Sequence, residues 1–218
     1  MIDVYLIVFF LSLLTLVFLL KLKTATYEQK ILGITILIAL PVEVLGGYLQ
    51  SKGINNLFLY HILIPIQYCL YSFIFYIAIK SVLLKNLIFY SIPVALLFSL
   101  VLFILDIQTV DTYNSYTIAL TSFLTCIWIL GYYRQVFTPL EIIYLEREPL
   151  FWVSTGLLFY SLGCFFVDGL MKELILNYPK LAKFYYYKVF LPLSCFLYVM
   201  FLISFICRNL FRKELNKL

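Results

Sequence analysis

The chain has 218 residues, of which 64% are hydrophobic and only 12% charged, and its mean hydropathy is +1.02. A soluble domain is roughly 45–50% apolar and about 25% charged, so this composition excludes a soluble enzyme, a disordered chain and a secreted disulfide scaffold. The net charge of +5 comes with no nucleic-acid-binding motif, and we expect no nucleic-acid partner. Seven membrane-spanning helices of about 20 residues need roughly 140 residues, which is close to the hydrophobic content of the chain.

Seven apolar segments along the chain are each long enough to cross a bilayer. Their approximate ranges are 2–20, 31–49, 57–79, 87–105, 116–137, 150–171 and 189–207. The apolar runs are continuous rather than alternating, which favours helices over a β-barrel, because lipid offers no partner for bare backbone groups. The sequence therefore predicts an all-α polytopic transmembrane bundle, formed as a single domain over 1–218 and surrounded by lipid. The first segment lacks a basic start and a cleavage site, so we expect it to be an uncleaved span.

Lysine and arginine divide unevenly between the two ends of such a bundle. One end receives Lys21, Lys23, Lys30, Lys80, Lys85, Arg134, Arg147, Arg208, Arg212, Lys213 and Lys217, and the other receives Lys52, Lys172, Lys180, Lys183 and Lys188. Basic residues accumulate on the cytoplasmic side of membrane proteins. We therefore expect the N-terminus outside and the C-terminus in the cytoplasm, in a bacterial cytoplasmic (inner) membrane. The stretch 172–188 is expected to form either short helices at the membrane interface or a solvated linker.

Three ionisable residues fall inside the apolar spans: Glu43, His61 and Asp168. A charged side chain at the bilayer centre costs about 3 kcal/mol or more, so such residues pair, neutralise or serve a function. Glu43 and His61 lie at similar depth, below the outer ends of two neighbouring antiparallel spans that a short turn connects. We expect them to face each other, with a polar cavity around them that opens outward and is closed toward the cytoplasm. The simpler interpretation is a hydrogen-bonded clamp between two helices.

Further polar side chains are expected at the same level. They are Asn56, Tyr60, Asn114 and Asp168, with Gln67 and Tyr160 expected deeper on the same faces of their helices. Together with Glu43 and His61 they form the predicted ligand-binding or proton-linked site. A single histidine and five cysteines without paired spacing give no metal-binding pattern, so we expect neither a metal nor a cofactor.

Two stretches resemble a known family. The first is Asn56-x3-Tyr60-His61-x5-Gln67-Tyr68, with Glu43 in the preceding span. The second is Pro149-x-Phe151-Trp152-x3-Gly156-x3-Tyr160-x2-Gly163. Both resemble an uncharacterised family of small seven-span bacterial integral membrane proteins. The resemblance implies a membrane protein without an attached soluble domain, and it implies no activity.

Three functions are compatible with these residues. The first, which we favour, is small-molecule or proton-linked sensing or transport, because histidine and a buried acid exchange protons readily near neutral pH. The second is a non-catalytic subunit, scaffold or membrane-perturbing effector of a larger assembly, as a homo-oligomer or with a membrane protein partner. The third is an intramembrane lipid-acting enzyme in which His61 is a general base, with Glu43 or Asp168 orienting it or acting as an acid. No nucleophile or metal is evident, so we assign no catalytic residue.

Overall fold

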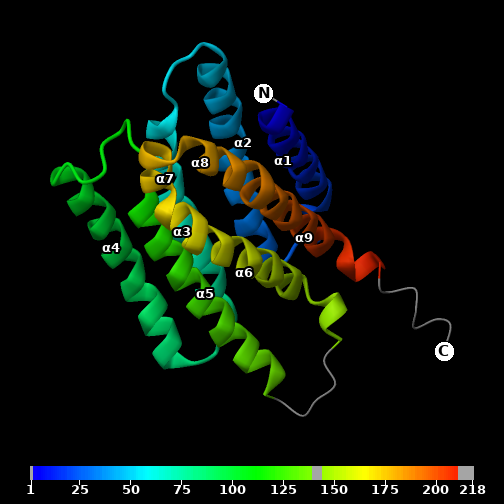
Figure 1. The fold of residues 1–218 in the computed structure, drawn as a ribbon. Coiled ribbons are helices and arrows are strands. Elements are labelled where there is room, and N and C mark those ends of the chain that lie inside the picture. Colours follow the sequence, from blue (N-terminus) through cyan, green and yellow to red (C-terminus); the bar gives the residue numbers. More distant parts are fainter. Residues whose placement is uncertain (1, 139–143, 211–218) are drawn as a thin grey trace.

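A computed structural model describes residues 2–138 and 144–210 of the chain (Figure 1). Within these ranges it contains no strand, and seven helices are long and apolar enough to cross a membrane. The spanning helices are α1 (Ile2–Lys21), α2 (Tyr27–Ser51), α3 (Leu57–Ala78), α4 (Val82–Ile104), α5 (Ser115–Phe137), α6 (Pro149–Val167) and α9 (Leu191–Leu210). The predicted all-α bundle with seven spans is confirmed, and the chain is an integral membrane protein.

The connection between α6 and α9 is helical along most of its length. It consists of the 3-10 turn η2 (Asp168–Leu170), α7 (Met171–Asn177), α8 (Pro179–Tyr185) and the π-helical turn η3 (Tyr186–Phe190). α7 and α8 lie at the end of the bundle that holds the N-terminus (Figure 1). Pro179 occupies the first position of α8, where its missing N–H costs nothing. Of the two alternatives for 172–188, the structure therefore has short helices.

Local sequence signals account for helix starts and for contacts between helices. Thr26 and Gln29 form a reciprocal capping box at the start of α2, in which the Gln29 amide donates to Thr26 Oγ1 and the Thr26 amide to Gln29 Oε1. The Gln29 side chain also donates to the Ser204 carbonyl, at 2.6 Å, and so joins the start of α2 to the end of α9. Gly156 lets α6 approach α9 closely, because a Cβ there would lie 2.8 Å from Met200 Cβ.

Six of the spanning helices form a closed ring, and α4 lies outside it. Around the ring, α1 contacts α2, α2 contacts α3, α3 contacts α5, α5 contacts α6, α6 contacts α9, and α9 returns to α1. α4 packs on the outer side of α3 and α5 (Figure 1). Side chains from all six ring helices therefore converge on a shared interior.

The interior of the ring is tightly packed in the half away from the N-terminus. Phe18, Leu32, Phe75, Ile129 and Phe205 are buried there in one apolar cluster. We call this region the packed half. Large apolar side chains on the outer surfaces of the helices stay exposed, as expected where lipid is the solvent. Three basic residues that contribute to the predicted orientation, Arg212, Lys213 and Lys217, lie outside the described residues.

Candidate functional site

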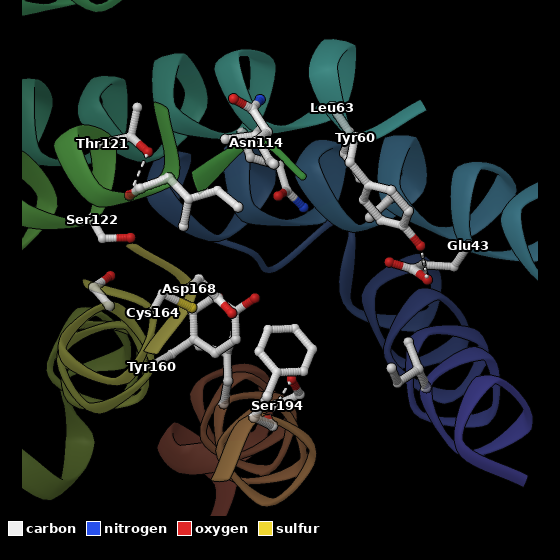
Figure 2. A pocket seen from close by; sticks show the side chains of 18 of the residues that line it. Glu43, Tyr60, Leu63, Asn114, Thr121, Ser122, Tyr160, Cys164, Asp168 and Ser194 are labelled. Atoms are coloured by element: carbon white, nitrogen blue, oxygen red, sulfur yellow. Dashed lines mark hydrogen bonds between the residues drawn. The ribbon is translucent and has the colours of Figure 1, made fainter. Parts of the chain in front are cut away.

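The other half of the ring encloses a cavity of about 320 Å³. Within the described chain, its walls come from α1, α2, α3, α5, α6 and α9 and from the segments that precede α5 and α9, whereas α4 contributes none of them (Figure 2). A second hollow of about 370 Å³ adjoins it under α7 and α8 and shares Val4, Gln50, Tyr113 and Tyr186 with it. Small-molecule sites typically measure about 300–1,000 Å³, so the inner cavity has the size of a small-ligand site.

The floor of the cavity is apolar and closed. Leu11, Ile36, Leu157, Leu197 and Phe201 line it and are almost fully buried. The same five residues belong to the apolar cluster that fills the packed half. Among the described residues, the packed half therefore separates the cavity from the opposite end of the bundle.

Glu43 and Tyr60 meet at one wall of the cavity. The Tyr60 hydroxyl donates to Glu43 Oε2 at 3.0 Å, which links α2 to α3 (Figure 2). One turn further along α2, the Asn56 side chain donates to the Gly46 carbonyl, also at 3.0 Å. The expected convergence of α2 and α3 residues is therefore present, with Tyr60 as the partner of the acid.

His61 does not line the cavity. Its Nε2 lies 2.9 Å from the Thr112 carbonyl oxygen, in the connection between α4 and α5. A carbonyl oxygen only accepts hydrogen bonds, so Nε2 is the donor in this contact. The expectation that His61 faces Glu43 in a polar pocket is thus wrong: His61 fastens the turn whose next residues, Tyr113 and Asn114, do line the cavity.

Asn114 projects from that turn into the cavity (Figure 2), and one side of its amide is held in place by Gln108. The side-chain amide of Gln108 is oriented so that its nitrogen donates to Asn114 Oδ1 at 3.0 Å. Its oxygen accepts from the backbone amides of Ser115 and Tyr116, at 2.9 Å each. Gln108 thereby caps the start of α5. Asn114 is almost fully buried, yet its Nδ2 has no hydrogen-bond partner among the described residues.

Asp168 supplies the second acidic group of the cavity, from the end of α6 (Figure 2). It is 2% exposed, and its Oδ1 has no hydrogen-bond partner in the described part of the chain. The Lys172 amide donates to Ser115 Oγ at 2.9 Å and so holds the start of α7, just beyond Asp168, against the start of α5. Burial, together with the nearby Asp168 carboxylate, raises the pKa of the Tyr113 hydroxyl well above its ordinary value. Tyr113 is therefore a neutral hydrogen-bonding group at neutral pH.

Two further predicted residues, Gln67 and Tyr160, also line the cavity. Gln67 lies deeper on α3, about two turns below Tyr60, on the same face of the helix. The Tyr160 ring packs against Phe190 of η3, with ring centroids 5.9 Å apart. Of the eight predicted site residues, all except His61 therefore line the cavity.

Several cavity residues were missed by reasoning from the sequence. They include Tyr113, Thr121, Ser122, Thr125, Ser161, Cys164, Ser194 and Tyr198. A repeat of threonines every four residues on α5 could have indicated two of them, because residues four apart share one helix face. The hydroxyls of Thr121 and Thr125 donate to carbonyls one turn earlier, at 2.8 and 2.7 Å, which satisfies them within their own helix. No sequence signal indicated the tyrosines.

The charge of the cavity is one-sided. Glu43 and Asp168 line it, whereas none of its described lining residues is a lysine, arginine or histidine. The nearest basic lining residue belongs to the adjoining hollow, where Lys183 of α8 is exposed. No group of three or more His, Cys, Asp or Glu residues in the described ranges is arranged to hold a metal ion. The site is therefore an acidic, hydroxyl-rich cavity with an apolar floor.

Comparison with known proteins returned no relative of this chain. No family model matches it, and neither a curated protein nor a solved structure is significantly similar to it. The resemblance to a family of small seven-span bacterial membrane proteins stays a prediction, and the candidate function rests on the geometry of the cavity.

Proposed function

We propose that the protein binds a small molecule in the cavity of the helix ring and acts as a sensor or transporter of that ligand. The main support is that two buried polar atoms of the cavity lining, Asn114 Nδ2 and Asp168 Oδ1, have no hydrogen-bond partner among the described residues. An unsatisfied buried polar group costs about 1–3 kcal/mol. A ligand that accepts from Asn114 and donates to Asp168 would recover this free energy.

The closed floor supports sensing or gated transport rather than an open channel. The apolar residues of the packed half leave no continuous polar route through the described bundle. Binding would have to alter helix packing before a signal or a ligand could reach the other end. The contact of the Gln29 side chain with the Ser204 carbonyl, between α2 and α9, is one link that such a change would affect.

The geometry gives less support to an intramembrane lipid-acting enzyme. That mechanism requires His61 to act as a base beside Glu43 or Asp168. His61 instead bonds to the Thr112 carbonyl and does not line the cavity, whereas both acids do. We therefore propose a binding role with no catalytic residue.

A cavity-filling substitution tests the proposal, and the neighbouring residue provides a matched control. Ser161 is buried and lines the cavity, whereas the adjacent Leu162 is 41% exposed on the lipid-facing side of α6. Native mass spectrometry of protein released from gentle detergent should detect a bound small molecule on the wild type and on Leu162→Phe. Ser161→Phe should lose that adduct and keep the fold, as judged by circular dichroism. Equal adducts on all three proteins, or none on any, would contradict the proposal.

We also propose that the cavity opens to the outside of a bacterial cytoplasmic membrane. The support is the excess of lysine and arginine at the opposite end of the bundle. An epitope tag before Ile2 should react with antibody on intact spheroplasts, and a tag after Leu218 should react only after lysis. Reaction of both tags on the same face would exclude this orientation.

A further inference from the structure

We infer that the ligand class is an organic cation: a small amphiphile in which a protonated amine interacts with Glu43 and Asp168 and an apolar tail lies on the cavity floor. This inference rests on the proposed function and specifies its ligand. It follows from the charge, the hydrogen-bonding capacity, the aromatic lining and the shape of the cavity.

The charge of the lining favours a positive partner. Glu43 and Asp168 come from different sides of the ring, α2 and the end of α6 (Figure 2), and none of the described residues that line the cavity is basic. Lys183 of α8 lines the adjoining hollow and not the cavity itself. Acids inside a membrane bundle are costly unless a countercharge or a proton accompanies them. A cationic ligand would supply the countercharge that the described chain does not.

The acids retain free hydrogen-bonding capacity. A carboxylate accepts up to about four hydrogen bonds, whereas an ammonium group donates three and accepts none. Asp168 Oδ1 has no donor among the described residues, and Glu43 accepts the hydrogen bond of the Tyr60 hydroxyl at Oε2. Both carboxylates can therefore accept from an amine. The remaining donor, Asn114 Nδ2, would suit an acceptor elsewhere on the ligand, such as a hydroxyl or carbonyl oxygen.

Aromatic rings surround the space next to the acids. The lining includes Tyr60, Tyr113, Tyr160, Tyr186 and Tyr198. Aromatic faces attract cations, by about 0.5–2 kcal/mol per contact, and such rings commonly enclose organic ammonium groups. Below them, the floor offers the aliphatic side chains of Leu157 and Leu197. The cavity is therefore polar and acidic at one level and apolar at the next, as an amphiphile requires.

Four probes that share one apolar tail separate the contribution of charge from that of hydrophobicity. They are octylamine, octyltrimethylammonium, octanol and octanoate, titrated at pH 7 into the full-length protein in phosphatidylcholine nanodiscs, with empty nanodiscs as the blank. Charge-assisted hydrogen bonds are roughly twice as strong as neutral ones. We expect octylamine to bind at least about tenfold more tightly than octanol, octyltrimethylammonium to fall between them because it cannot donate, and octanoate to bind most weakly.

Substitution of the acids tests where the amine binds. Asp168→Asn and Glu43→Gln should each weaken octylamine binding by about tenfold and leave octanol binding unchanged. Glu173→Gln is the matched control, because Glu173 lies on the exposed part of α7 and lines neither hollow. If Asp168→Asn does not fold, Glu43→Gln and the probe series in the wild type still decide the question.

The outcomes distinguish the ligand class from the binding role. Equal affinity for octylamine and octanol, tighter binding of octanoate, or unchanged octylamine affinity in Glu43→Gln would overturn the organic-cation inference. The binding role would stand in those cases, provided that Ser161→Phe abolishes binding of the probe that does bind. If Ser161→Phe leaves the binding of every probe unchanged, the cavity is not the binding site and both proposals fail.

Discussion

The two halves of the helix ring are built by the same six helices and yet fill their interiors differently. In the packed half, Phe75 and Ile129 are completely buried in an apolar cluster. In the cavity half, Glu43 and Asp168 line the cavity instead. The difference arises from a few polar side chains that face inward at one end. In a membrane bundle, these side chains distinguish a structural interior from a candidate binding site.

The largest expected effect is a difference between the two halves in the stability lost when a buried apolar side chain is truncated. Phe75→Ala in the packed half should lower the free energy of unfolding by about 3 kcal/mol, because it leaves a void among close-packed side chains. Leu63→Ala should cost clearly less, because the buried Leu63 side chain already borders the cavity. Thermal unfolding in detergent would measure both, with Phe103→Ala on the lipid-exposed face of α4 as the control. Equal losses for Phe75 and Leu63 would mean that the two halves are packed alike.

A second prediction concerns the turn that presents Asn114 to the cavity. His61→Ala should destabilise this turn by about 1 kcal/mol, because it removes the hydrogen bond to the Thr112 carbonyl. Hydrogen exchange of the amides in 109–113 should become faster, and ligand affinity should fall although His61 does not line the cavity. His61→Gln retains a hydrogen-bond donor, so it should restore part of the protection from exchange and part of the ligand affinity. Unchanged exchange in His61→Ala would show that the bond does not hold the turn.

The hydrogen bond between Tyr60 of α3 and Glu43 of α2 should contribute less to the stability of the bundle. A double-mutant cycle with Tyr60→Phe and Glu43→Gln should give a coupling energy of about 0.6 kcal/mol, the usual value for a hydrogen bond between membrane helices. Tyr5→Phe is the control, because Tyr5 is 70% exposed on α1. A coupling energy indistinguishable from zero would mean that the Tyr60–Glu43 hydrogen bond does not stabilise the contact between the two helices.

The smallest expected effect on stability comes from the ionisation of Tyr113, which occurs at alkaline pH. Its pKa is raised by burial and by Asp168, so folding favours the neutral hydroxyl. This contribution to stability is complete below the pKa of about 10 of an unfolded tyrosine and decreases as the pH rises through and above that value. Between pH 9 and 11, the melting temperature of the wild type should therefore decrease more steeply than that of Tyr113→Phe. Parallel curves for the two proteins would contradict the burial of this hydroxyl.

The sequence predicted the helices well and their interior contacts only in part. Continuous apolar runs predicted all seven spans, because the length of a membrane helix follows from bilayer thickness. Depth along the helix placed Glu43 level with both Tyr60 and His61. Adjacent residues on a helix point about 100° apart, so depth alone could not tell which of the two would face the acid.

What the sequence determined by itself is the class of protein and the number of its membrane spans, because transfer into lipid depends on local composition. The tertiary structure decided that α4 lies outside the ring and that α7 and α8 lie at the cavity end. It also decided that the turn held by His61 delivers Asn114 to the cavity. These features depend on helix rotation and on contacts between distant segments, and a one-dimensional pattern of hydropathy contains neither.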